Sequence, residues 1–168
     1  QEFQARRGYD LTKYLPAVTG RIVGDFSTTE KFLWDFRRTI GDLDADNHYG
    51  RLAERSHQDG LSFSTEPYGG PFEFAQVGTR ADFPMDEFWL PTSPEGNKPA
   101  LPGVSAGHVA GRRIIGAEAF TSGPPEEKWN SHPYSLKALG DFIWTAGVNR
   151  FVIHVSAQQP LIGEHLQP

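Results

Sequence analysis

Apolar residues recur at spacings of three and four in two stretches of this chain, a pattern typical of amphipathic helices. The longer helix is expected over residues 27–43, where Ser27 and Glu30 have the spacing of a capping box, and its apolar stripe can continue until Gly60 stops it. The other is expected over residues 135–146. The remaining pattern predicts two shorter helices, over 72–77 and 108–112, and a loop over 9–26.

Short runs with alternating apolar residues separate these helices, as expected of strands. They cover residues 61–68, 82–88, 114–120 and 150–156. Because helices and strands alternate, we expect an α/β fold with a parallel sheet of about four β/α units. Such a sheet is part of a (β/α)8 barrel of the TIM type, so residues 1–168 are expected to form a single domain that is a fragment of a larger catalytic barrel.

The two edge strands of a four-stranded parallel sheet have unpaired backbone groups, which other strands or helices must cover. The remainder of the barrel or a second copy of the chain could supply it, or the sheet could be open and flavodoxin-like. Residues 90–103 contain four prolines and show no periodicity. We therefore expect them to form an exposed loop across the strand ends.

Three glutamates, Glu66, Glu87 and Glu118, each lie where an apolar run is expected to meet a turn. Carboxylates at successive strand ends build the active site of a (β/α) barrel. A pair of them suits glycoside hydrolysis, because one protonates the leaving oxygen while the other attacks the sugar or activates water. Glu66 and Glu118 are the preferred pair. Glu87 is a third catalytic candidate, or a ligand to a sugar hydroxyl or to a hard cation such as calcium.

Each glutamate considered alone is more often a solvated surface residue, so the hypothesis depends on three of them in similar positions. Aromatic side chains flank the same turns, and Tyr68, Trp89 and Trp129 can pack on the apolar face of a sugar ring. Core packing is the alternative role for these aromatic residues. His132 and His154 are candidates for hydrogen bonds to substrate, whereas their spacing does not favour a zinc site.

Composition excludes several other functions. The net charge of -5 and the scattered arginines do not favour nucleic acid as a partner, and the sequence contains no glycine-rich phosphate loop. Without cysteine there is no disulfide framework and no thiolate site. No run reaches the roughly 18 apolar residues of a membrane span, so no membrane partner is expected. The chain lacks an initiator Met and a leader, and we expect it to be a piece of something larger.

Several motifs in a fixed order resemble glycoside hydrolase family 106, the α-L-rhamnosidases. The resemblance covers residues 9–160, and the matching motifs are Phe32–Arg38, Glu66–Gly70, Ala81–Trp89, Glu118–Ser122, His132–Tyr134 and Asn149–His154. It implies a (β/α)8 barrel, an inverting mechanism, a calcium ion that contacts the sugar, and a secreted or periplasmic protein of bacteria that degrade plant polysaccharides. On the matching positions Glu87 and Glu118 would be acid, base or calcium-associated groups, with Glu66 in the same pocket. Family members are several times longer, so a catalytic carboxylate or a calcium ligand can lie outside this chain.

The expected function is therefore that of an exo-acting α-L-rhamnosidase, which removes terminal rhamnose from a glycan or glycoside by direct attack of water. One alternative is a non-catalytic carbohydrate-binding or structural barrel fragment that uses the same carboxylates and aromatic rings. Another is a different barrel glycosidase, such as a β-galactosidase-like enzyme, which would differ in sugar preference and stereochemistry.

Overall fold

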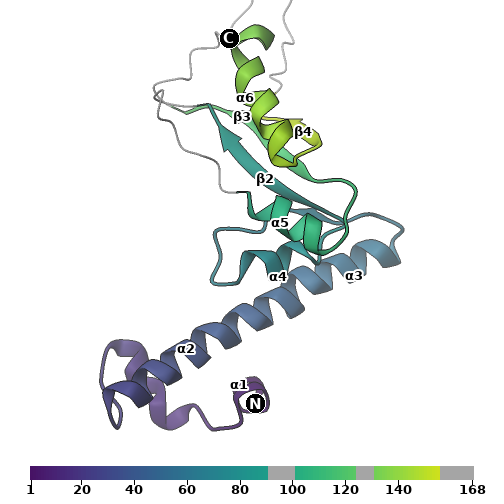
Figure 1. Cartoon of the computed structure of the whole chain (residues 1–168). Coiled ribbons are helices and arrows are strands. Elements are labelled where there is room, and N and C mark those ends of the chain that lie inside the picture. The colour runs from purple at the N-terminus through teal and green to yellow at the C-terminus, as the bar shows by residue number, and fades with distance from the viewer. Residues whose placement is uncertain (91–100, 124–130, 156–168) are drawn as a thin grey trace, which may run out of the picture.

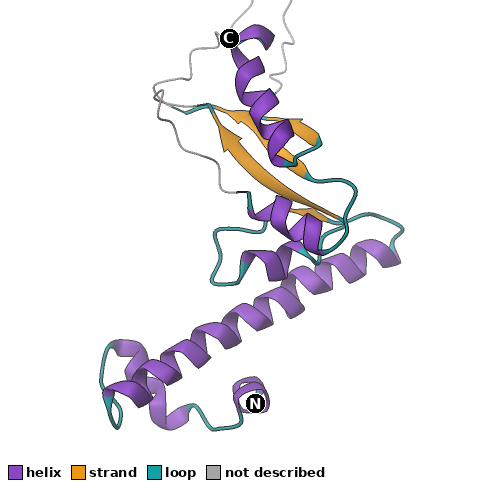
Figure 2. Cartoon of the chain, viewed as in Figure 1, coloured by secondary structure: helices purple, strands orange, loops and turns teal. Residues whose placement is uncertain are grey.

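A computed structural model describes residues 1–90, 101–123 and 131–155. Four parallel strands form one sheet in the order β1-β2-β3-β4, with helices between successive strands, which confirms the predicted α/β class (Figure 2). The elements of the described residues are, in chain order, α1 (Glu2–Arg7), the 3-10 helix η1 (Thr12–Thr19), α2 (Phe26–Leu43), the π-helix η2 (Asp44–Gly50), α3 (Arg51–Gln58), β1 (Ser64–Thr65), α4 (Phe74–Gly78), β2 (Phe83–Trp89), α5 (Pro102–Val109), β3 (Gly116–Thr121), α6 (Pro133–Ala146) and β4 (Arg150–Ile153).

The N-terminal helices pack through an aromatic cluster at the far end of α2 from the sheet (Figure 1). Phe32 of α2 is buried there, with its ring centroid 5.9 Å from that of Phe3 in α1 and 5.3 Å from that of Tyr14 in η1. The prediction of a loop over 9–26 is therefore wrong, because η1 occupies the middle of this stretch and contributes a ring to the cluster.

The start of α2 also differs from the prediction. Its N-cap is Asp25, whose carboxylate accepts a hydrogen bond of 2.6 Å from the backbone N–H of Thr28. The expected capping box of Ser27 and Glu30 is wrong, because Asp25 already satisfies one of the free N–H groups and the helix begins one residue before Ser27. The chain remains helical after α2, as the continuing apolar stripe indicated, through η2 and α3.

Helix α5 corrects the end of the loop predicted over 90–103, because it begins at Pro102, and the bounds of the helix predicted over 108–112. It begins at Pro102, because Asp86 of β2 accepts backbone hydrogen bonds from Gly103, over 2.6 Å, and from Val104, over 2.8 Å. Proline has no N–H to satisfy at the first helical position. A carboxylate from a distant strand thus fixes the start of α5, while residues 91–100 lie outside the described part of the chain.

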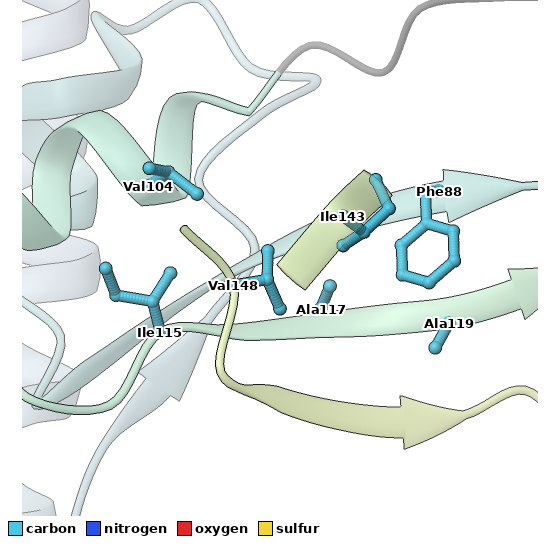
Figure 3. Packing of buried hydrophobic residues seen from close by; sticks show 7 residues of the cluster. All are labelled: Phe88, Val104, Ile115, Ala117, Ala119, Ile143 and Val148. Carbon is cyan, nitrogen blue, oxygen red and sulfur yellow. The ribbon is translucent and has the colours of Figure 1, made fainter. Parts of the chain in front are cut away.

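Helices α5 and α6 cover one face of the sheet, and the main apolar core lies between them and the strands (Figure 3). Phe88, Ala117 and Ala119 point to this face from β2 and β3 and are almost fully buried. Val104 of α5 and Ile143 of α6 pack against them from the helices (Figure 3). The core therefore fixes β2 and β3 from one side and leaves their other face for different side chains.

The strands are shorter than expected at the sheet edges. In β1 only Ser64 and Thr65 pair with β2, although a strand was expected over 61–68. Pro67 offers no backbone N–H for further pairing.

None of the helices within residues 1–90, 101–123 and 131–155 has the length and apolar character of a membrane-spanning segment.

Candidate active site

The face of the sheet opposite α5 and α6 carries the predicted glutamates. Side chains alternate along a strand, so Glu87 lies on the opposite face from the buried Asp86 and Phe88 of β2. Glu118 is the register partner of Glu87 in the adjacent strand β3, and Glu66 directly follows β1. The three carboxylates therefore lie on neighbouring strands, toward the carboxyl ends, where a (β/α) barrel places its active site.

Only Glu66 lies at a turn. The prediction that Glu87 and Glu118 also lie at turns is wrong, since both are inside strands. Strand β2 continues to Trp89 and β3 to Thr121, and the pairing extends further through a hydrogen bond of 2.8 Å from the Leu90 N–H to the Thr121 carbonyl. The two carboxylates are thereby held on paired backbone rather than on mobile loops.

Tyr68 connects two of the three glutamates. Its hydroxyl lies 2.9 Å from Oε2 of Glu66 and also donates to Oε2 of Glu87. A phenol has one proton to donate, so both contacts are favourable only when one of the two carboxyl groups carries a proton itself. Tyr68 therefore links two carboxyl groups of the site through a single hydroxyl.

The surroundings of Glu66 disfavour its ionised form. Burial raises its pKa, and the nearby charges of Glu118 and Glu87 raise it further, against the opposing effects of the Tyr68 hydrogen bond and of His154. Burial and the two glutamates also raise the pKa of Tyr68 far above its ordinary value, so the phenol stays protonated. The Tyr68 hydroxyl is therefore the donor toward both glutamates.

Trp89 contributes an aromatic surface at the end of β2. Its indole Nε1 donates to Oε1 of Glu87, so both oxygens of that carboxylate accept hydrogen bonds. The Trp89 ring lies against Gly123, where a Cβ would be 3.2 Å from the Trp89 Cζ3 atom. With 51% of its surface exposed, Trp89 is available to stack on a ligand ring.

Glu118 has partners of its own. The hydroxyl of Thr121 donates to Oε1 of Glu118 over 2.5 Å, and Nδ1 of His154 lies 3.5 Å from the same oxygen. The side chain of Glu118 remains 26% exposed. A half-buried carboxylate that is held by a hydroxyl and an imidazole can accept a proton from a bound water.

The structure thus brings together six of the sequence-predicted site residues: Glu66, Tyr68, Glu87, Trp89, Glu118 and His154. His132 occupies the N-cap of α6 and is exposed, with its ring stacked 6.4 Å from that of Tyr134. In the described residues no recorded contact joins His132 to the glutamates, and its binding role stays a prediction. Trp129 lies outside the described residues.

Sequence reasoning missed two residues near the site, Thr121 and Asp86. Thr121 is three positions after Glu118, and regular alternation would have placed it on the opposite face. Asp86 is fully buried behind Glu87, and its proximity to the start of α5 depends on the tertiary fold. The signal for Asp86 was an acidic residue at one of the alternating positions of β2 that are otherwise occupied by Pro84 and Phe88.

The resemblance implies a calcium ion near Glu87. The described residues contain no group of three or more histidine, aspartate or glutamate side chains arranged to hold a metal ion. Glu87 already accepts hydrogen bonds from Tyr68 and Trp89. Its role as a calcium ligand stays a prediction.

Comparison with known proteins places this chain in one family. The sequence model of glycoside hydrolase family 106, described as alpha-L-rhamnosidase, matches residues 1–166. A protein of Formosa agariphila named "Putative beta-glucuronidase" is 45% identical over 159 residues, which are 95% of this chain and 13% of that protein. The rhamnosidase from Novosphingobium sp. PP1Y superimposes with a TM-score of 0.82 at 34% identity, over 92% of this chain and 15% of that one. The four-stranded parallel sheet is thus similar to a portion of a rhamnosidase, and the chain belongs to glycoside hydrolase family 106.

Proposed function

We propose that this chain is the carboxylate-bearing part of an exo-acting α-L-rhamnosidase that hydrolyses terminal α-L-rhamnose with inversion at the anomeric carbon. The observation that carries the proposal is that Glu87 and Glu118 are register partners on adjacent strands, and that Tyr68 joins Glu87 to Glu66, which directly follows β1. Inversion of the anomeric configuration is proposed from the resemblance to glycoside hydrolase family 106, and a separate experiment below tests it.

The environments of the glutamates suggest a division of roles. Burial and the neighbouring glutamates raise the pKa of Glu66, and this direction suits a general acid that donates its proton to the leaving oxygen. Glu118 accepts a proton from the attacking water, which then bonds to the anomeric carbon as the glycosidic bond breaks. Glu87, held by Tyr68 and Trp89, binds a sugar hydroxyl.

The charge of the site favours a neutral sugar over a uronic acid. Three glutamates face the site, and His154 is the one basic side chain among the described residues that is recorded beside them. A glucuronate carboxylate in this position would meet like charges without an arginine or lysine from the described residues, whereas rhamnose carries no charge. This observation favours rhamnose over the glucuronide suggested by the name of the Formosa protein.

The rest of the barrel is the proposed partner of this chain. The chain spans about an eighth to a seventh of the length of the two related proteins. Strand β4 forms one edge of the sheet, where Val152 and Ile153 are 46% and 55% exposed. We propose that further strands of the same protein pair with β1 and β4 and close the barrel, and a second copy of the chain is the alternative that the mass of the assembly would reveal.

The primary test uses the complete protein that carries this chain and measures release of nitrophenol from 4-nitrophenyl α-L-rhamnoside, with the β-D-glucuronide and β-D-galactoside as competing substrates. We expect turnover of the rhamnoside alone. Preferred cleavage of either other glycoside would overturn the proposed substrate. Binding of rhamnose by a folded protein without any turnover would support the non-catalytic alternative.

Two further readouts address the mechanism and the metal. Proton NMR during the first minutes of hydrolysis should show β-L-rhamnose as the first product, whereas α-L-rhamnose would exclude inversion. Calcium remains a proposal from the resemblance, and chelation followed by calcium addition should abolish and restore turnover. A secreted or periplasmic location is likewise a proposal, which an antibody against the chain tests in cell fractions.

A further inference from the structure

Strand β3 contains a β-bulge at its carboxyl end, beside the candidate site. Phe88 of β2 pairs with Ala119 of β3, but the next residue of β2, Trp89, pairs with Thr121, so Phe120 is an extra residue. The φ angle of Phe120 is 62°, in the left-handed region that residues other than glycine seldom adopt. Bulges re-aim side chains and are frequent next to active sites.

The bulge reverses the alternation of side chains at the end of β3. In a regular strand, Phe120 would share the face of Glu118 and Thr121 would point toward the helices. Instead, the Phe120 ring packs on the helix-covered side, with its centroid 5.0 Å from that of Phe88. Gly140 of α6 makes room for it, because a Cβ at that position would lie 3.2 Å from the Phe120 Cζ atom.

Thr121 consequently lies on the same face as Glu118. It is only 2% exposed, and its hydroxyl donates to Oε1 of Glu118 over 2.5 Å. His154 also approaches Oε1, at 3.5 Å. Among the described residues both recorded contacts engage Oε1, which leaves Oε2 of Glu118 to interact with a reacting water.

We propose that Thr121 is a positioning residue that fixes the rotamer of Glu118, and that the bulge at Phe120 exists to aim its hydroxyl at that carboxylate. The proposal rests on the glycosidase function proposed above. Thr121 acts through Glu118 and does not itself contact substrate. A hydrogen bond to a carboxylate is among the stronger ones, and small displacements of a reacting group reduce rates steeply.

The test compares Thr121→Val, which keeps the shape but lacks the hydroxyl, with Thr121→Ser, which keeps the hydroxyl. In the complete protein, we expect Thr121→Val to lower kcat about 10- to 100-fold with KM changed by less than about 2-fold, as for loss of one hydrogen bond to a charged group. Thr121→Ser should retain most of kcat. Crystal structures should show the Glu118 carboxylate displaced in Thr121→Val and unmoved in Thr121→Ser.

Full kcat in Thr121→Val, or an equal loss in Thr121→Ser, would overturn the proposal. If Thr121→Val fails to fold, Thr121→Ala replaces it, with the same expectations. Failure of the proposed function is a distinct outcome, because the wild-type protein would then not hydrolyse the rhamnoside at all. In that case the crystal structures still decide, since an unmoved Glu118 in a variant without the hydroxyl would exclude positioning by Thr121.

Discussion

The two faces of strands β2 and β3 have opposite physical roles, although they share one backbone. On the helix-covered face, Phe88, Ala117 and Ala119 are buried against α5 and α6, which stabilises the sheet through the removal of apolar surface from water. On the other face, Glu87 and Glu118 are register partners, and like charges in that arrangement destabilise a sheet. The comparison indicates that one face supplies stability, which offsets the unfavourable electrostatics needed for chemistry on the other.

This difference predicts that substitutions on the two faces have separable effects, and the largest is expected for loss of a site carboxylate. Glu118→Gln and Glu66→Gln should each lower kcat about 10²- to 10⁴-fold, because an amide cannot exchange the proton. The midpoint of urea unfolding should stay the same or rise, since Glu118→Gln removes a negative charge next to Glu87, and Glu66→Gln removes a buried carboxyl group whose ionised form is unfavourable beside the other two. Both quantities are measured on the same preparations of the complete protein.

Glu30→Gln is the matched control for these variants, because Glu30 is an exposed glutamate on α2, away from the sheet. It should change neither kcat nor the unfolding midpoint. A site variant with unchanged kcat would remove that glutamate from the proposed mechanism. A site variant that unfolds readily would instead show that the two faces are not separable.

The second prediction concerns the helix-covered face of the sheet, to which Phe88, the residue after Glu87, contributes its ring. Phe88→Ala should lower the free energy of unfolding by about 3–5 kcal/mol, because the buried ring leaves a cavity. Phe142→Ala on α6 is the matched control, since that ring is 52% exposed and should cost much less. Urea titration gives both values, and equal losses in the two variants would contradict the assigned core.

The alternation of residues made part of this division predictable from sequence. The alternating apolar residues indicated strands over 82–88 and 114–120, and the turn at Pro67 placed Glu66 at a strand end, whereas Glu87 and Glu118 were expected at turns and lie inside strands. The contact between Tyr68 and Glu87 was not predictable, because the two residues are brought together by the pairing of separate strands. Register depends on tertiary packing, which a single strand pattern does not contain.

Two errors of the sequence analysis have the same physical origin. The start of α5 was missed because its cap is the side chain of Asp86 in β2 and not a residue next to the helix. Thr121 was missed because one extra residue, Phe120, inverts the alternation at the end of β3. A single inserted residue leaves no distinct composition or spacing, so the structure was needed to find this contact to Glu118.

The smallest expected effect concerns Asp86, an acidic residue that is buried on the helix-covered face of the sheet. Burial raises its pKa from an ordinary value of 3.8 to about 6, against the backbone hydrogen bonds from Gly103 and Val104, which lower it. The folded state therefore binds a proton more tightly than the unfolded state does. The stability from this group is fully present below about pH 3.8 and is lost as the pH rises through about 6, a change of at most about 3 kcal/mol.

Asp86→Asn tests this dependence, because asparagine is neutral at every pH in that range. The free energy of unfolding of the wild type minus that of Asp86→Asn should decrease between pH 4 and pH 7, as measured by urea titrations at several pH values. Other carboxylates such as Asp42 and Asp82, whose pKa values are lowered by their partners, have the opposite pH dependence. They are common to both proteins and cancel in the difference. If the difference in unfolding free energy between the two proteins does not depend on pH, Asp86 ionises as easily in the core as in water. The helix-covered face of the sheet would then tolerate a charge as well as the face that carries the glutamates does.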